Sequence, residues 1–261
     1  MKNELIFIGI LLLSLSSVKA QNTRINDQNQ IGWYNYFGTF KIAEKFSLLT
    51  EFQARRTNYI SDKQQNLARV GLNFQANSKL LLRLGYAWIE TYPYGEYAIN
   101  GQGKNFTEHR IFQMATFTDK ISKFELSHRF MLEQRFVGRY SKPELTVEDE
   151  YTFMNRIRYM FRIQMPLKGT EIKNKTPYIA AYNEIFIGFG KNVNENIFDQ
   201  NRIGLLLGYR LDTNFRIEAG FLNQTLQLGR EINQQNVFQS NNGFIINTMF
   251  NFDLTKKSQK Q

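Results

Sequence analysis

Apolar and polar residues alternate with a period of two along most of the chain. In residues 46–56, Phe46 and Phe52 occupy one parity, whereas Glu51 and Arg55 occupy the other. Because successive side chains of a β-strand point to opposite faces, one face of such a strand suits lipid and the other suits water. Eleven stretches show this pattern, over residues 30–41, 46–58, 66–76, 79–91, 106–118, 123–137, 151–165, 177–188, 201–211, 214–227 and 243–253.

The connections between these stretches are alternately short and long. Tight turns are expected near residues 43–44, 77–78, 119–120 and 212–213, and long polar segments over 92–105, 138–150, 189–200 and 228–242. Only the connection 166–176 is longer than this alternation predicts. Bacterial barrels place short turns on the periplasmic side and longer loops outside. The pattern therefore predicts an all-β fold, a transmembrane antiparallel up-and-down β-barrel of about 10 to 12 strands with short periplasmic turns and longer extracellular loops.

The count of eleven stretches conflicts with the even strand number that is usual in bacterial single-chain barrels. Either residues 21–29 add a poorly patterned strand, or the first stretch does not complete the wall and ten strands close it. We therefore expect ten or twelve strands. A soluble barrel or a β-sandwich is the competing fold, but it would have to bury the apolar face of every one of these long strands.

The first residues have the pattern of a cleaved secretory signal. Lys2 precedes an apolar run over residues 5–13, and the small-residue ending at Ala20 predicts Gln21 as the mature start. No later segment has the 18 or so continuous apolar residues of a membrane helix. The expected organisation is a signal peptide (1–20), an N-terminal segment (21–29), an outer-membrane β-barrel (30–254) and a basic C-terminal tail (255–261).

Composition agrees with a barrel rather than a helical membrane protein. The chain has 23 Phe and 13 Tyr, yet its mean hydropathy is negative, as expected where every second strand residue faces water. It has no Cys, which excludes disulfides, a lipoprotein anchor and thiolate chemistry. Aromatic residues near strand ends are predicted to form two girdles at the membrane interfaces, namely Trp33, Tyr34, Trp88, Tyr92, Tyr94, Tyr140, Tyr151 and Tyr178.

The formal net charge of +10 is carried mostly by residues within the predicted strands. It therefore indicates a property of the lumen rather than a nucleic-acid interface. The predicted lumen-lining, anion-binding residues are Arg55, Arg69, Arg83, Arg129, Arg135, Arg156, Arg158, Arg162, Arg202, Arg210 and Arg216, and the predicted lumen carboxylates are Glu51, Glu125, Glu133, Glu184 and Glu218. Because a guanidinium is always charged and offers a planar fork of donors, this surplus predicts a channel or porin-like passage favouring small anionic solutes.

Two alternatives stay open. In the first, the charges pair across a narrow lumen and make a closed structural or interaction barrel with a salt-bridge network. Replacing Arg156, Arg158 and Arg162, which share one wall, should weaken anion preference in an open passage, but should lower stability in a closed barrel. Glycines on the lumen parity either bend the wall or leave room in the bore, at Gly85, Gly204, Gly208 and Gly220.

The second alternative is a lipid-modifying outer-membrane enzyme with a displayed Ser and His. The candidate histidines are His109 and His128. Ser127 points away from His128 because adjacent strand residues occupy opposite faces, which leaves only Ser141 to approach it. No catalytic residue is assigned on this evidence. The histidines lie on separate strands and no Cys is present, so no metal site is predicted, and no glycine-rich nucleotide loop or other cofactor site is found.

Four segments carry a resemblance to a known family. They are the run from Leu126 to Phe136 and the segments 155–159, 182–186 and 199–202. In their order along the chain they resemble the landmarks of domain-of-unknown-function family 2490. The resemblance spans essentially the whole mature chain. It implies an outer-membrane β-barrel of a kind frequent in Bacteroidetes, with no assigned activity and no catalytic residues to transfer.

These features together predict a location in the cell outer membrane. The expected partners are outer-membrane lipid and lipopolysaccharide, and, during biogenesis, periplasmic chaperones and the barrel-assembly machinery. The last strand, with Phe244, Phe250 and Phe252 on one parity, resembles the aromatic C-terminal strand that this machinery reads. Small anionic solutes are the expected cargo, and nucleic acid is not an expected partner.

Overall fold

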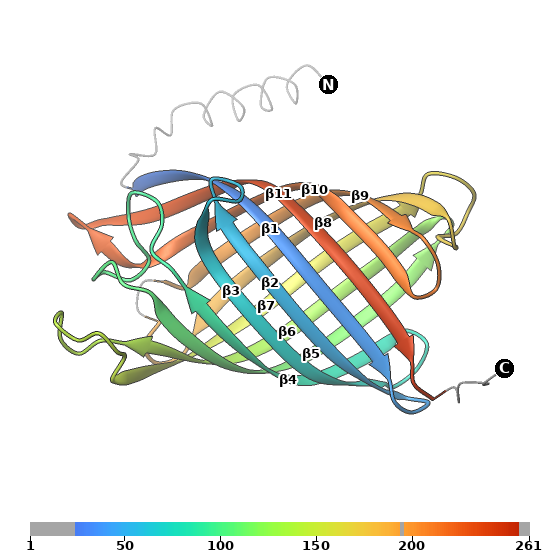
Figure 1. The fold of residues 1–261 in the computed structure, drawn as a ribbon, viewed down its shortest axis with the longest axis horizontal. Coiled ribbons are helices and arrows are strands. Elements are labelled where there is room, and N and C mark those ends of the chain that lie inside the picture. The colour runs from blue at the N-terminus through green and yellow to red at the C-terminus, as the bar shows by residue number, and fades with distance from the viewer. Residues whose placement is uncertain (1–23, 194–195, 256–261) are drawn as a thin grey trace, which may run out of the picture.

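The computed structural model describes residues 24–193 and 196–255. The predicted signal peptide and the basic tail beyond Thr255 lie outside this part. Within it, eleven strands form one closed barrel (Figure 1). They are β1 (Arg24–Lys41), β2 (Phe46–Thr57), β3 (Asp62–Gln75), β4 (Leu80–Thr91), β5 (Phe106–Ile121), β6 (Phe124–Arg139), β7 (Glu150–Pro166), β8 (Thr176–Phe189), β9 (Phe198–Arg210), β10 (Phe215–Ile232) and β11 (Gln235–Asp253). The described chain holds no helix of the length and apolarity that crossing a membrane requires.

The barrel closes through one parallel pair of strands. Consecutive strands pair antiparallel, whereas β1 and β11 run in the same direction, from Arg24 opposite Asn236 to Lys41 opposite Asp253. An odd number of up-and-down strands requires such a seam, because the first and last strands then point the same way. For the described residues, eleven strands confirm the predicted range of about 10 to 12, whereas the preference for an even number, ten or twelve, is wrong.

Three strand boundaries differ by five or more residues from the sequence-based prediction. β1 begins at Arg24, so part of the predicted N-terminal segment belongs to the wall. Residues 228–242 are not a long loop, because β10 and β11 continue through them to a tight turn. At this turn Asn233 and Gln234 have positive φ values of 50° and 62°, the conformation that matches the twist of a two-residue hairpin.

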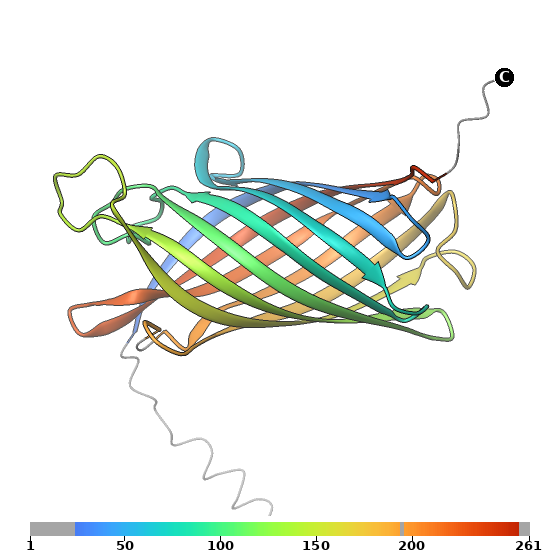
Figure 2. The same cartoon turned by 90° about the horizontal axis from the view of Figure 1, so that it is seen from below.

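The two ends of the barrel differ in their connections (Figure 2). Residues 92–105 and 140–149 connect strands at one end, called here the long-loop end. At the other, the short-turn end, most connections are tight, as at residues 42–45 and 122–123. The connection between Pro166 and Thr176 is the exception at the short-turn end, as its sequence predicts.

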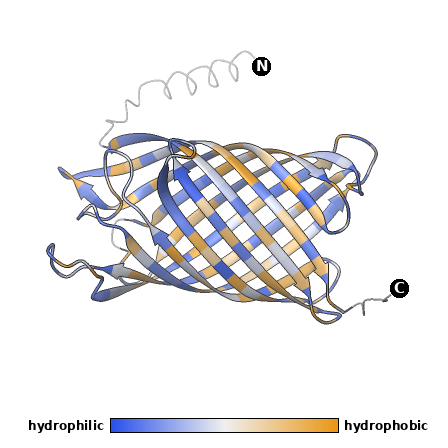
Figure 3. Ribbon diagram, in the orientation of Figure 1, coloured by the Kyte–Doolittle hydropathy of each residue, from blue (hydrophilic) through white to orange (hydrophobic). Residues whose placement is uncertain are grey.

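Hydrophobic and hydrophilic residues alternate along the strands (Figure 3), and burial places the apolar ones outside and the polar ones inside, as the alternation predicts. On β9, Leu205 and Leu207 are 55% and 61% exposed on the outer surface, whereas Gln200 and Arg202 are buried in the lumen. The inner surface also has an apolar cluster, in which Trp33 of β1 packs with side chains of β8 to β11. A closed sheet with an apolar exterior and a charged interior is the construction of a transmembrane β-barrel.

Three aromatic residues assigned to the interfacial girdles instead point inward. Trp33 and Tyr178 are buried in the lumen, at 3% and 0% exposure, and Tyr94 of the 92–105 loop is 7% exposed. For these three the girdle prediction is wrong. Trp33 occupies the inward parity of β1, together with the buried Asn35, so its position follows the strand register rather than its residue type. Tyr151, in contrast, is half exposed on the outer wall.

The variant Leu205→Arg tests whether the outer wall contacts hydrocarbon. We expect it to lower the free energy of unfolding by about 2–4 kcal/mol, since a charged side chain near the bilayer midplane loses its hydration. Equilibrium unfolding of the protein refolded in lipid vesicles measures this change. The matched control is Leu211→Arg at the short-turn end, also exposed, where we expect about 0–1 kcal/mol. Equal costs at the two positions would contradict a lipid-facing Leu205.

Candidate functional site in the barrel lumen

Alternation on neighbouring strands brings acidic and basic side chains together inside the barrel. Glu133 and Arg135 point inward from β6, Arg156 and Arg158 from β7, and Glu184 from β8. Neighbouring strands lie roughly 4.8 Å apart, so long side chains on adjacent inward positions reach one another. The period-two pattern on β5 to β9 thereby builds a continuous layer of charge.

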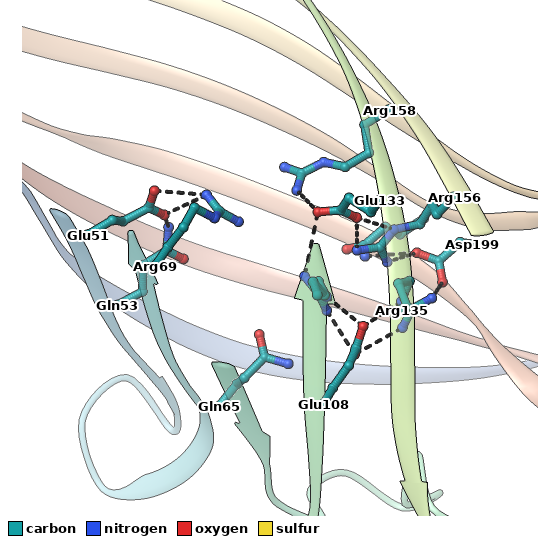
Figure 4. A network of polar contacts seen from close by, with 12 residues as sticks. Glu51, Gln53, Gln65, Arg69, Glu108, Glu133, Arg135, Arg156, Arg158 and Asp199 are labelled. Atoms are coloured by element: carbon teal, nitrogen blue, oxygen red, sulfur yellow. Dashed lines mark hydrogen bonds and ion pairs between the residues drawn. The ribbon is translucent and has the colours of Figure 1, made fainter. Parts of the chain in front are cut away.

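Glu133 lies at the centre of this layer and is fully buried (Figure 4). Its carboxylate accepts hydrogen bonds from Arg156 Nε at 2.7 Å and from Arg158 Nη1 at 2.8 Å. Arg110 Nη1 lies 3.8 Å from Glu133 Oε1. Burying a charge costs several kcal/mol unless opposite charges and hydrogen bonds compensate it. The positive charges of the three guanidiniums therefore stabilise the buried Glu133 carboxylate, and its negative charge stabilises theirs.

Further carboxylates extend the layer in both directions. Toward the long-loop end, Glu108 pairs with Arg135 at 2.6 Å, and Asp199 accepts from Arg156 Nη1 at 2.6 Å. Toward the short-turn end, Glu184 accepts from Arg129 and Arg158 at 2.7 Å and 2.8 Å. We call these nine residues the charge network: Glu108, Arg110, Arg129, Glu133, Arg135, Arg156, Arg158, Glu184 and Asp199.

Two smaller ion pairs lie outside the charge network. Glu51 accepts two hydrogen bonds from Arg69, at 2.8 Å and 2.9 Å. Glu218 accepts from Arg162 at 2.5 Å and from the Tyr178 hydroxyl at 2.8 Å. Each pair links positions on different strands and thus ties the wall together through the lumen.

Apart from Arg210, four predicted lumen arginines have no close carboxylate. In the described residues, Arg55, Arg83 and Arg216 form no ion pair within 4.0 Å, and Arg202 reaches Glu184 only at 4.0 Å. Their guanidiniums instead contact side-chain amide oxygens or a methionine sulfur. These four arginines therefore keep positive charge that the protein itself does not neutralise at short range.

The lumen holds two cavities, one on each side of the charge network. The upper cavity, at the long-loop end, has a volume of about 180 Å³ and is lined by seven basic and two acidic side chains. The lower cavity, at the short-turn end, has about 1010 Å³ and is lined by ten basic and five acidic side chains. Both cavities are therefore electropositive, and Arg55 and Arg202 line both of them.

The structure places most of the predicted lumen residues beside these cavities. Ten of the eleven arginines line one or both cavities, whereas Arg210 lies beside the short-turn end and donates to the backbone carbonyls of Ile172 and Asp212. Four predicted carboxylates line the lower cavity, and Glu133 is enclosed in the charge network. Arg210 has the inward parity of β9, but at the short-turn end its guanidinium hydrogen-bonds the connection before β8 instead of lining either cavity.

The sequence-based assignment missed Glu108, Arg110 and Asp199. On β5 the inward face carries the apolar Phe112 beside Glu108 and Arg110. The outward face includes the polar residues His109 and Gln113. Polarity therefore does not distinguish the two faces of this strand in the sequence. Asp199 and Gln200 are neighbours in sequence, yet both line the upper cavity. The register shift between β8 and β9 at this point allows it, because a β-bulge breaks the period of two.

The lumen glycines make room for aromatic rings rather than for an open bore. A Cβ on Gly204 would lie 2.1 Å from the Tyr182 ring, and one on Gly208 would lie 2.3 Å from the Tyr178 ring. Each ring thus lies directly over a glycine of the neighbouring strand. The prediction that glycines leave room in the bore therefore does not hold for Gly204 and Gly208, where aromatic rings fill that room.

The 92–105 loop folds into the long-loop end of the barrel. Tyr94 lines the upper cavity and accepts a hydrogen bond from Asn241 Nδ2 at 3.0 Å. The carbonyl of Ala98 accepts from Arg230 Nη2 at 2.8 Å, which attaches the loop to β10. Burial raises the pKa of Tyr94 to about 12, so its hydroxyl stays protonated at neutral pH. This loop covers part of the entrance to the upper cavity.

The candidate Ser and His residues do not come together. His128 lies on β6 near the short-turn end, where its Nδ1 is 2.8 Å from the Tyr159 hydroxyl. Ser141 follows the opposite end of β6 and donates to Asp149 Oδ2 at 2.5 Å. The suggestion that Ser141 approaches His128 is therefore wrong. No group of three or more potential metal-binding side chains occurs in the described residues.

Comparison with known proteins bears mainly on family membership. No curated protein matches the chain. A solved structure titled "NanC porin structure in rhombohedral crystal form" is similar with 11% identity and a TM-score of 0.46, over 85% of this chain and 98% of that chain. That similarity is too distant to carry an argument about function. A family model with the description "Protein of unknown function (DUF2490)" matches residues 30–236, as the landmark segments predict. The chain therefore belongs to this family of proteins of unknown function, DUF2490.

Proposed function

We propose that the protein is a non-enzymatic outer-membrane β-barrel whose lumen favours the passage of small anionic solutes. The observation that carries this proposal is the excess of basic over acidic side chains in both lumen cavities. A narrow space lined by one sign of charge, with low-dielectric walls, concentrates ions of the opposite sign. Guanidiniums keep their charge at any physiological pH, so the preference does not depend on titration of the lining.

The outer-membrane location rests on the two surfaces of the wall together with the predicted export signal. Side chains such as Leu205, Phe221 and Ile157 expose apolar surface around the outside. Lipid solvates that surface, and closure of the sheet satisfies the backbone groups that lipid cannot. Outer-membrane lipid and lipopolysaccharide are therefore the proposed surroundings, and the assembly machinery is the proposed partner during biogenesis.

A second candidate function is a closed structural barrel. The observation that favours it is the burial of Glu133 and Arg156, at 0% and 1% exposure, between the two cavities. A layer this well packed resists the passage of hydrated ions. In this case the surplus arginines would bind anions without conducting them.

Planar-bilayer recording distinguishes these two functions. The mature protein, refolded in detergent, is added to a bilayer under a potassium chloride gradient, and single-channel conductance and reversal potential are measured. We expect discrete conductance steps and a reversal potential displaced toward the chloride equilibrium potential. Folding is checked independently by the shift in electrophoretic mobility on heating and by β-sheet circular dichroism. A folded protein with no conductance, or with cation selectivity, would overturn the proposed passage.

A further inference from the structure

Two arginines that line both cavities pack against one tryptophan. Arg55 Cζ lies 3.8 Å from the centroid of the Trp33 ring, and Arg202 Cζ lies 4.8 Å from it. Trp33 is itself fixed, because its indole Nε1 donates to Gln64 Oε1 at 2.8 Å. Both guanidiniums line both cavities.

The charge of this arginine pair is not neutralised at close range. Both residues are buried, with exposed fractions of 6% for Arg55 and 8% for Arg202. Arg55 donates to the neutral amide oxygens of Gln53 and Gln65, and Arg202 donates to that of Gln200. Each guanidinium has five N–H donors, and these bonds use three of them in Arg55 and two in Arg202. Unused donors, and a buried charge with no carboxylate closer than 4.0 Å, are the features of a binding site for an anion with a planar fork of oxygens.

The surroundings of the pair are suited to hydroxyl groups. Gln64, Gln65, Gln200 and Gln224 all line the upper cavity. A primary amide both donates and accepts hydrogen bonds, so it matches a hydroxyl, which does the same. Tyr94 of the covering loop adds a hydroxyl to the upper cavity, whereas Trp33 lines only the lower cavity and packs against the two guanidiniums. Two guanidiniums, four amides and one hydroxyl thus line the upper cavity together.

We propose that the upper cavity is a binding site for a small sugar acid, whose carboxylate lies on Arg55 and Arg202. The surrounding glutamine amides bind its hydroxyl groups. The cavity of about 180 Å³ corresponds to roughly six water molecules at about 30 Å³ each, which suits a single sugar unit rather than a chain. This inference rests on the proposed anion-favouring lumen, and it adds the site of binding and the class of ligand.

Tryptophan fluorescence gives a direct binding measurement. The chain has two tryptophans, Trp33 and Trp88. In the Trp88→Phe variant, emission reports only on Trp33, beside the proposed carboxylate site. The refolded protein is titrated separately with glucuronate, glucose and acetate at constant ionic strength. We expect glucuronate to change the emission and to bind about tenfold or more tightly than either glucose or acetate, because it alone engages both guanidiniums and amides.

Two variants in this background locate the site. Arg202→Gln should weaken glucuronate binding about tenfold or more, because it removes one of the two charges on the carboxylate. Arg216→Gln is the matched control, since Arg216 also lacks a close carboxylate but lines only the lower cavity. We expect it to leave glucuronate binding unchanged. Equal losses in the two variants would show a general charge effect and would overturn the assigned position.

The outcomes separate this inference from the proposed function. Equal affinity for acetate and glucuronate would overturn the recognition of hydroxyl groups while leaving an anion-favouring lumen intact. Absence of glucuronate binding by a protein that conducts anions would likewise overturn only the sugar-acid site. Tight binding by a protein that does not conduct would support the site and overturn the passage.

Discussion

Replacing Glu133 by Gln should lower the free energy of unfolding by roughly 3–5 kcal/mol, the cost of breaking a buried ion pair. The carboxylate neutralises Arg156 and Arg158 and lies within 3.8 Å of Arg110. Without its charge, Arg158 would retain Glu184 and Arg156 would retain Asp199, but the network would carry one more unpaired positive charge. Equilibrium unfolding in lipid vesicles, followed by tryptophan fluorescence, measures the change.

The control for this experiment is Glu125→Gln. Glu125 also lines the lumen, but it is only half-buried and accepts its hydrogen bond from the neutral amide of Gln164 at 2.7 Å. We expect a loss of less than about 1 kcal/mol, as for partly solvated polar contacts. If Glu133→Gln proves no more destabilising than Glu125→Gln, the charge network does not hold the barrel together in the way described.

The double variant Arg83→Gln, Arg216→Gln should strongly weaken anion selectivity. Both arginines line the lower cavity, and neither forms an ion pair with a described residue, so their removal changes lumen charge without breaking a pair. A unit charge about 4 Å away contributes roughly 1 kcal/mol to an anion even in water, or about fivefold in local concentration. We expect the chloride-to-potassium permeability ratio, obtained from the reversal potential, to fall about fivefold or more.

Arg210→Gln is the matched control for selectivity. It removes the same charge from a position outside both cavities, where the guanidinium donates to backbone carbonyls. Its reversal potential should stay near that of the unmodified protein. Replacing Arg156, Arg158 and Arg162 would be a poorer test of anion selectivity than the double variant. Each of the three is ion-paired, so its loss would change stability together with charge. An unchanged permeability ratio in the double variant would contradict the role of the unpaired arginines.

The barrel wall was predictable because, in a membrane strand, alternate side chains must be apolar toward lipid and polar toward the lumen. On β2, Phe52 faces out and Glu51 and Arg55 face in, as their parity predicts. Closure was not predictable in the same way. The usual even count reflects what other barrels do, whereas the parallel pairing of β1 with β11 depends on long-range register that no local pattern encodes.

The positive charge of the lumen was predictable, but the pairing of its charged side chains was not. The inward arginines follow from parity, whereas Asp199 became visible only through the register shift between β8 and β9. Trp33 illustrates the other limit. Its residue type favours an interfacial girdle, but the strand register turns it inward, where it packs against Arg55 and Arg202. Which arginines pair and which stay free depends on distances across the lumen.

The parallel seam also has a consequence for how the chain folds. Every other pairing joins strands that follow one another in sequence, whereas Asn35 and Asn247, hydrogen-bonded across the seam, are 212 positions apart. Because the entropy cost of closing a loop grows with its length, we expect the pairing of β1 with β11 to form last. Until then both edge strands would expose unsatisfied backbone groups to lipid. We therefore expect the pairing of β1 with β11 and the completion of membrane insertion to occur together. An intermediate with an open wall should be stable only where another protein segment pairs with its two edge strands.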